Sequence, residues 1–170
     1  IGANPTIART GAYYHDIGKL SCPMYFAENM HGNNVHDSMD PYDSAKIILA
    51  HPSNGEELAK NNKLPPVIIN MIKEHHGTSL VKFFYYKQCK AAEAEPHKIP
   101  KPQESDFRYK GPLPSSRESA VVMLADTVEA AVRSSISKGM TEKEVDDFIR
   151  LLINDKLNDG QLKNSCLTIN

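Results

Sequence analysis

The segment YHDIGK, residues 14–19, is the part of the sequence on which the interpretation of fold and function depends. It sets an imidazole beside a carboxylate, His15 and Asp16, at the end of an apolar helix, and a glycine and a lysine follow at once. A second such pair, His36-Asp37, lies in the segment NNVHDSMD. With seven histidines in the chain, chance alone supplies such dipeptides, so other residues must decide what the pair means.

The bulk composition indicates one ordinary globular domain. The chain has 170 residues, 40% apolar and 24% charged, and this length suits one well-buried domain better than two. The net charge of -1 provides no basic field for a DNA or RNA polymer. A small anionic ligand, which needs only a few local cations, remains compatible with this charge.

The cysteines and the apolar segments bear on the compartment. Cys22, Cys89 and Cys166 are odd in number and far apart, which favours reduced thiols in the cytosol. No apolar run approaches the length of a membrane span, so we expect no direct membrane contact from these residues. The chain begins with Ile1 and not with methionine, and we expect an upstream segment to be missing.

Helix start and stop signals recur along most of the chain. Five of the six starts combine a capping residue with a proline or with a glutamate three residues later, one start is a pair of prolines, and each stop is a glycine. The predicted starts are Asn4-Pro5, Asp40-Pro41, Ser53 with Glu56, Pro65-Pro66, Ser115 with Glu118 and Thr141 with Glu144, and the stops are Gly18, Gly77, Gly139 and Gly160.

The rest of the pattern predicts an all-α fold. Residues 81–95 are ambiguous by pattern but end in helix formers, so we interpret them as a helix. Alternation with a period of two occurs only in the tail, residues 162–169, so a sheet is not expected. Residues 21–40 and 96–114 are rich in turn formers. We therefore predict a single helical bundle with two long loops, which often shape a binding site.

The side chains that carry chemistry lie at helix ends or on apolar faces. A single histidine at a helix C-terminus usually compensates the helix dipole. Asp126, inside the apolar segment VVMLADTVEAAV, could pair with Arg133 two turns later. A buried carboxylate is unfavourable unless something positive pairs with it, and several histidines that end apolar helices point to a metal. The candidate ligands are His15, Asp16, His51, His75, His76 and Asp126.

Imidazole and carboxylate ligands suit zinc, iron, manganese or nickel rather than calcium. His15 and Asp16 point about 100° apart on a helix, so they converge on one ion only where the helix ends, or the carboxylate lies between two ions. A two-metal centre would use all six residues and favours in-line displacement at phosphorus by a bridging hydroxide. Lys19 would then neutralise charge on a phosphate oxygen. His31, His36 and His97 lie in polar loops and are not expected to bind metal.

Four segments together resemble a known family: HDIGK, then His51, then EHHGT, then MLADTVEAAVRS. They are similar to the HD-domain metal-dependent phosphohydrolases, and in particular to the cytoplasmic HD domain of the seven-transmembrane, PgpH-type cyclic di-AMP phosphodiesterases. The similarity spans most of residues 4–138, and a C-terminal helix is expected over 141–159. It implies two divalent transition metal ions, iron or manganese, and hydrolysis of cyclic di-AMP to 5'-pApA. It also implies a parent protein anchored in a membrane, with this domain on the cytoplasmic side.

The resemblance also implies roles for individual residues. Asp16 would bridge the two ions, His15 and Asp126 would bind one of them, and the remaining histidines would bind the other. The implied set is therefore metal ligands His15, Asp16, His51, His75, His76 and Asp126, and substrate contacts Lys19, Tyr109 and Arg133.

One feature departs from the family. Its motif begins with a histidine upstream of HDIGK, and residues 1–14 contain none, which we attribute to truncation. The related HD-GYP branch, which cleaves cyclic di-GMP, has a glutamate and a Gly-Tyr-Pro triplet after its double histidine, whereas His75-His76 precede GTSLVKFF. Two alternatives stay open: hydrolysis of another nucleotide (cyclic di-GMP, a dNTP or an alarmone), and a non-catalytic cyclic-dinucleotide sensor.

Overall fold

The computed structural model describes residues 2–30, 32–136 and 139–167, and every regular element in these ranges is helical. This confirms the all-α prediction. The one β-type pairing among the described residues is an isolated bridge between Leu80 and Arg108. The α-helices are α1 (Pro5–Tyr14), α2 (Pro41–Asn61), α3 (Pro66–Glu74), α4 (Lys82–Ala94), α5 (Arg117–Ile136) and α6 (Glu142–Asn158).

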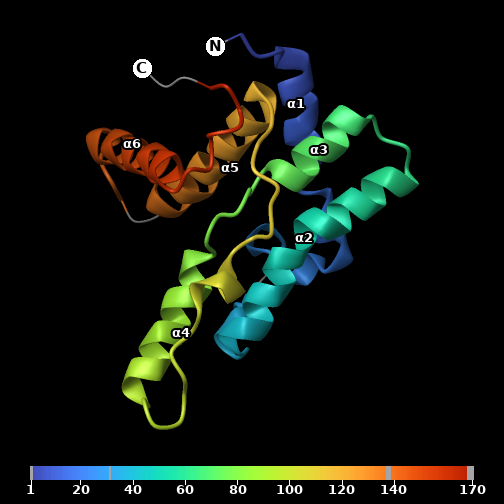
Figure 1. The fold of residues 1–170 in the computed structure, drawn as a ribbon. Helices are drawn as coiled ribbons and strands as arrows, with labels where there is room; N and C mark the ends of the chain where they lie inside the picture. Colours follow the sequence, from blue (N-terminus) through green and yellow to red (C-terminus); the bar gives the residue numbers. More distant parts are fainter. Residues whose placement is uncertain (1, 31, 137–138, 168–170) are drawn as a thin grey trace.

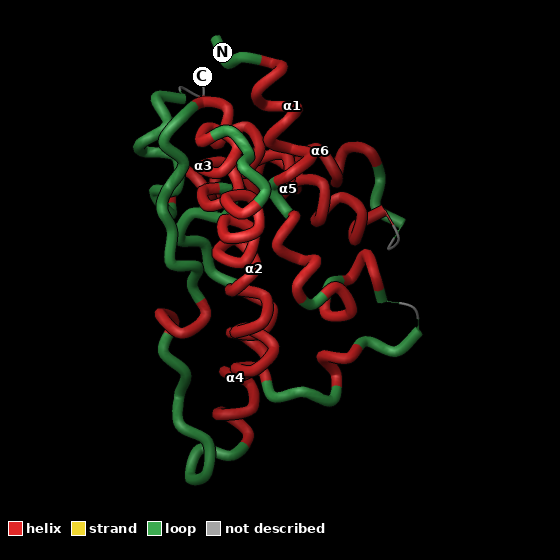
Figure 2. Tube along the Cα trace, turned by 90° about the vertical axis from the view of Figure 1, so that its right-hand side faces the viewer, coloured by secondary structure: helices red, strands yellow, loops and turns green. Residues whose placement is uncertain are grey.

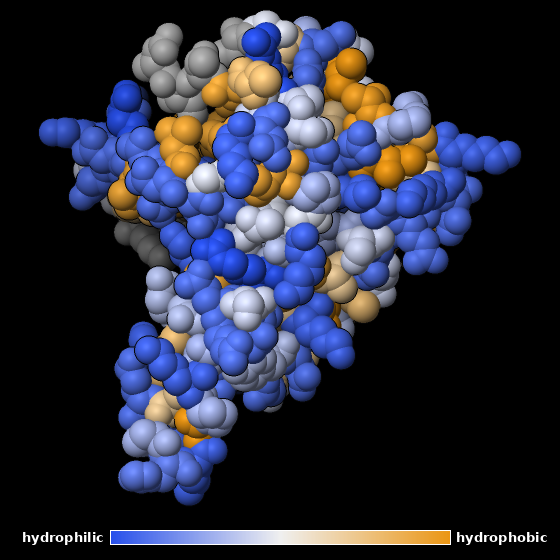
Figure 3. All heavy atoms as spheres, viewed as in Figure 1, coloured by the Kyte–Doolittle hydropathy of each residue, from blue (hydrophilic) through white to orange (hydrophobic). Residues whose placement is uncertain are grey.

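The long helix α2 crosses the molecule and packs against α3 and α4 (Figure 1). Helix α1 packs on α3 and α5, and α6 lies along α5. Helix α4 and the loop after it protrude from this body, as both ribbon views show (Figures 1 and 2). The protruding part is largely hydrophilic on the face seen in Figure 3. Within the described ranges, none of the helices has the length and apolar character needed to cross a membrane.

Three of the predicted helix starts are confirmed by their caps. The Asn4 side chain accepts hydrogen bonds from two backbone N–H groups in the first turn of α1. Asp40 accepts one from Tyr42 N at the start of α2. Thr141 and Glu144 form the reciprocal capping box of α6. In each case a side chain satisfies backbone donors that have no partner inside the helix.

The helix start predicted at Ser53 with Glu56 is wrong, because α2 continues through these residues without interruption. Ser53 Oγ does not cap a new helix but donates to Ala50 O at 2.8 Å. Glu56 pairs with Lys60 and with another lysine on α3. The spacing of a capping box was present, but both side chains have other partners.

The predicted capping box of α5 is also wrong. Ser115 donates from both its backbone N and its Oγ to the buried carboxylate of Glu74. Glu118 accepts from Asn4 N at 2.6 Å. The first turn of α5 is bonded instead by Ser116 Oγ, which accepts from Ser119 N. Glu74 of α3 thus binds the segment that leads into α5, and Glu118 of α5 binds the start of α1.

The two predicted loops are present and partly ordered into 3-10 turns. In the first, His36 is buried, and its Nε2 donates to Tyr25 O at 2.8 Å. His97 is exposed, and His31 lies outside the described residues. The second loop pairs with the segment before α4, because Tyr109 N donates to the Ser79 carbonyl. His36 and His97 belong to neither group of potential metal ligands among the described residues. All three cysteines are free.

Candidate metal centre

Six side chains from four parts of the fold converge on one point. His15 and Asp16 follow α1, His51 is on α2, His75 and His76 follow α3, and Asp126 is on α5. They form two groups in which the candidate donor atoms lie within 4.8 Å of one another, and Asp16 belongs to both. The groups are Asp16, His51, His75 and His76, and His15, Asp16 and Asp126. These are the six residues that the sequence predicts, divided in the way that the resemblance implies.

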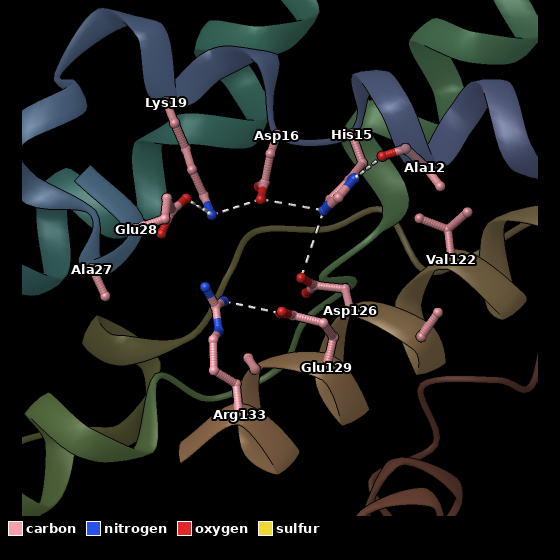
Figure 4. A pocket seen from close by; sticks show the side chains of 12 residues that line it. Ala12, His15, Asp16, Lys19, Ala27, Glu28, Val122, Asp126, Glu129 and Arg133 are labelled. Carbon is pink, nitrogen blue, oxygen red and sulfur yellow. Dashed lines mark hydrogen bonds and ion pairs between the residues drawn. The ribbon is translucent and has the colours of Figure 1, made fainter. Parts of the chain in front are cut away.

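The two oxygens of Asp16 face different histidines. Its Oδ1 is 3.2 Å from His51 Nε2 and 3.6 Å from His75 Nε2. Its Oδ2 is 3.2 Å from His15 Nε2 (Figure 4). A carboxylate in this position can provide one oxygen to each of two cations.

Asp126 closes the other side of the centre. Its Oδ1 is 3.5 Å from His15 Nε2, and its Oδ2 is 3.7 Å from His76 Nδ1. The side chain of Asp126 is only about one-fifth exposed although it lies on an apolar helix. The imidazole groups around it provide the positive or metal-binding environment that such a carboxylate requires.

Backbone carbonyls fix the orientation of three of the four imidazole rings. Because a carbonyl only accepts, each Nδ1–H donates, and each Nε2 is turned to the centre. The pairs are His15 Nδ1 with Ala12 O at 2.8 Å, His51 Nδ1 with Ile48 O at 2.7 Å, and His75 Nδ1 with Ile72 O at 2.7 Å.

A proline explains why a backbone carbonyl is available to the His51 ring in the middle of a helix. The carbonyls of Ala12 and Ile72 lie in the last turns of α1 and α3, where no later N–H bonds them. Helix α2 continues, but Pro52 has no N–H with which to bond Ile48 O. Pro52 therefore leaves a free acceptor directly below the His51 ring.

Replacing Pro52 by alanine is expected to lower the metal affinity of the centre by up to about tenfold, because the new N–H competes with the His51 ring for Ile48 O. The free energy of unfolding should stay the same or rise, since the helix gains a backbone hydrogen bond. Titration with Mn²⁺ and urea denaturation measure the two effects. A loss of stability without a loss of affinity would contradict this role for Pro52.

The close approach of the rings fits a cation. His51 Nε2 and His75 Nε2 are 3.1 Å apart, so a proton or a cation must lie between two nitrogens that would otherwise bring their lone pairs together. His15 Nε2 and Asp16 Oδ1 are buried and have no hydrogen-bond partner. Imidazole nitrogens and carboxylate oxygens are ligands of divalent transition metals. The residues present therefore fit such ions.

The charges of these groups also suit metal binding. Burial raises the pKa of Asp16, but its contacts with the surrounding histidines, His15 first, outweigh burial and hold that pKa far below its ordinary value. Burial lowers the pKa of both His75 and His76, so these rings are neutral at pH 7. Burial also lowers the pKa of His15, but contacts with Asp126 and Asp16 outweigh it and raise that pKa to about 10. Of these groups, only His15 must lose a proton before it binds a metal.

Gly18 has a packing role that the sequence does not reveal. It lies in the 3-10 turn η1 (Ile17–Ser21), directly against α2. A Cβ at this position would overlap with the carbonyl oxygen of His51 and lie 2.5 Å from Gly55 N. The glycine of the HDIGK segment is therefore needed for the close approach of two backbones, not only to stop a helix.

Lys19 is held between two carboxylates. Its Nζ is 2.6 Å from Asp16 Oδ2 and 2.6 Å from Glu28 Oε1 (Figure 4). Burial lowers the pKa of Lys19, but the two carboxylates, Asp16 first, raise it above its ordinary value. Glu28 was not predicted, because it lies in an irregular loop with no periodicity or motif to single it out.

A cleft of about 500 Å³ opens at the centre. His15, Asp16 and Lys19 line one side of it, and Asp126 and Arg133 of α5 line the other (Figure 4). The structure thus brings Arg133 to the same cleft as Asp126, as expected from their spacing of two turns. The guanidinium of Arg133 forms an exposed ion pair with Glu129 at 2.9 Å.

Tyr109 does not line this cleft. It is buried, and its ring stacks on His76 with the centroids 4.2 Å apart and the planes 22° apart. Burial raises the pKa of Tyr109 well above its ordinary value, with a further contribution from Asp126 and Asp16. Its place in the structure is behind a candidate ligand, where it fixes the plane of the imidazole.

Comparison with known proteins agrees with this description. The HD domain family matches residues 1–131. The chain is 43% identical to the cyclic-di-AMP phosphodiesterase PgpH of Bacillus subtilis over 169 residues, which are 99% of this chain and 22% of that protein. It is also 43% identical to PgpH of Listeria monocytogenes over 170 residues, again 99% of this chain and 22% of the relative. The chain thus spans about a fifth of the length of these curated relatives.

Solved structures show the same fold. The crystal structure of the L. monocytogenes PgpH HD domain superposes with a TM-score of 0.84 at 41% identity and covers 99% of this chain and 75% of that one. The same domain in complex with cyclic-di-AMP gives a TM-score of 0.85 at 42% identity, with the same coverage of both chains. The resemblance seen in the sequence is confirmed, and this chain belongs to the HD domain family.

Proposed function

We propose that this chain is a two-metal phosphodiesterase that hydrolyses cyclic di-AMP to 5'-pApA. The observation that carries the proposal is the pair of His/Asp donor groups that share Asp16. The substrate is supported by relatives that are named cyclic-di-AMP phosphodiesterases and by a similar HD domain in complex with cyclic-di-AMP. A net charge of -1 argues against a DNA or RNA polymer as substrate.

We assign the six candidate ligands to two ions, iron or manganese. Asp16 is shared, His15 and Asp126 complete one site, and the other histidines, His51, His75 and His76, complete the second. When bound, two such ions would supply Lewis acidity and an activated water for displacement at phosphorus. The Nδ1 contacts with backbone carbonyls hold three of the rings ready for this role.

The other residues of the cleft have supporting roles in this proposal. Lys19 and Arg133 place positive charge on opposite sides of the cleft, where they would stabilise charge on the phosphate oxygens. Glu28 fixes the Lys19 ammonium beside Asp16. Tyr109 was expected to touch the substrate, but its buried stack on His76 makes it a positioning residue instead.

We propose that residues 1–170 form one HD phosphohydrolase domain on the cytoplasmic side of a larger, membrane-anchored protein. This proposal is supported by the similarity along 99% of this chain to relatives of which the chain spans only 22%. The motifs at 4–138 and helix α6, predicted at 141–159, belong to this single unit.

Treatment with a chelator is expected to abolish hydrolysis of cyclic di-AMP, and Mn²⁺ or Fe²⁺ should restore it. Elemental analysis of the active protein should find two ions per chain. Turnover of cyclic di-AMP, cyclic di-GMP and a dNTP, measured side by side, tests the substrate. A preference for the triphosphate would contradict the substrate assignment, and tight binding of cyclic di-AMP by a metal-loaded protein without turnover would indicate a sensor.

A further inference from the structure

A second cavity adjoins the metal centre along α5. It has a volume of about 840 Å³ and is lined by residues of α4, α5 and α6. Ala130 lines both this cavity and the cleft described above, so the two share a wall. The metal centre and the roles proposed for its ligands do not account for the second cavity.

Lys156, in the wall of this cavity, has no ion-pair partner among the described residues. Lys156 Nζ donates to Ser79 Oγ at 2.6 Å, and no carboxylate among the described residues forms an ion pair with it. The other cations of the cavity are paired: Lys82 with Asp155 at 2.7 Å, and Arg108 with Asp159, directly after α6, at 3.0 Å. Lys156 therefore has donors that no carboxylate of the described residues engages in an ion pair.

The electrostatics of Lys156 agree with this view. Burial lowers its pKa to about 8, although Asp126 and Asp159 act in the opposite direction. Lys156 in turn helps to lower the pKa of His76, so its charge acts at the edge of the metal centre. A partly buried cation in this state is stabilised when an anion binds to it.

Two aromatic rings line the same cavity. Phe83 and Tyr86 are three residues apart on α4, on one side of the helix, and are 62% and 54% exposed. The flat face of a base stacks well on exposed aromatic rings. A cation beside exposed aromatic rings is suited to a phosphate with its attached nucleoside.

We propose that the second cavity binds the half of the cyclic dinucleotide that is not being cleaved. Lys156 binds the phosphate remote from the metal centre, and Phe83 and Tyr86 hold the neighbouring base. A cyclic dinucleotide carries two phosphates, and the metal centre engages only one of them, so the other requires a separate cation. This inference rests on the proposed function and extends its binding site across α5.

Two substrates of different size test the inference. Cyclic di-AMP would reach both cavities, whereas bis(p-nitrophenyl) phosphate has a single phosphate and would occupy only the metal centre. Lys156→Met is expected to lower kcat/KM for cyclic di-AMP by roughly ten- to a hundredfold more than for the small diester, mostly through KM. Lys156→Arg should restore part of the loss. Arg150→Met, which removes an ion-paired cation on the same helix that lines neither cavity, is the matched control and should change either value by less than about threefold.

Each outcome bears on the inference. Equal losses for both substrates would mean that Lys156 acts through the metal centre, and no loss for cyclic di-AMP would mean that it does not meet the substrate; either result overturns the proposal. If the wild-type protein hydrolyses neither substrate, the proposed function fails, and the affinity for cyclic di-AMP, compared between wild type and Lys156→Met, still decides whether the cavity binds it. If Lys156→Met does not fold, as judged by circular dichroism, the exposed pair Phe83→Ala and Tyr86→Ala takes its place in the same comparison.

Discussion

Replacing Asp16 by alanine is expected to remove both metal ions and to lower turnover of cyclic di-AMP by roughly a thousandfold or more. The reason is its position: one oxygen faces His51 and His75, and the other faces His15. No other residue of the described chain belongs to both donor groups. Elemental analysis and steady-state kinetics on the same protein sample measure the two losses together.

The chain offers a matched control for this substitution. Asp37 also follows a histidine, but it is exposed and belongs to neither donor group, so Asp37→Ala should retain two ions and full turnover. Asp126→Ala removes a ligand of one group only and should retain one ion. An Asp16→Ala protein that keeps two ions per chain, or a tenth of the original turnover, would contradict the assignment of Asp16.

Replacing Gly18 by alanine is expected to lower the free energy of unfolding by about 3 kcal/mol or more, because the added methyl group meets backbone atoms of α2 that cannot move aside. The turn would have to shift, and Asp16 and Lys19 would shift with it. We therefore expect weaker Mn²⁺ binding as well. Urea denaturation and a metal titration provide the two measurements.

Gly11 provides the comparison for Gly18. It is also buried, but a Cβ there meets Met71 Cε and lies 2.6 Å from Met71 Sδ, the flexible end of a side chain. Alanine also favours the helical conformation at that position. Gly11→Ala should therefore destabilise the protein by less than half as much as Gly18→Ala. If both variants lose the same free energy of unfolding, the loss in Gly18→Ala does not come from the contact with the α2 backbone.

The sequence was sufficient to predict the helices and the six candidate ligands, because both depend on local chemistry. A proline or a capping side chain acts within one turn, as at Asn4 and Asp40. The capping signals failed where a distant partner competed for the same side chain. Ser115 is bonded to Glu74, 41 residues away, and Glu118 to Asn4, 114 residues away. Such competition depends on the tertiary fold and leaves no trace in a short window of sequence.

The supporting residues of the centre were missed for the same reason. The sequence interpretation placed Pro52 at a break between two helices, whereas α2 runs through it and its missing N–H frees the carbonyl that orients His51. Glu28 reaches Lys19 from a loop, with no motif around it. The type of a ligand can be predicted from the sequence, whereas the groups that hold it in place depend on the fold.

The centre draws its side chains from the ends of α1 and α3 and from the middle of α2 and α5, so it lies where separate parts of the bundle meet. An ion bound there would tie these parts together and would favour the folded over the unfolded chain by RT ln(1 + [ion]/Kd). Resistance to heat then becomes a function of how much free metal surrounds the protein. At a low concentration of that metal, a smaller fraction of the protein would be folded.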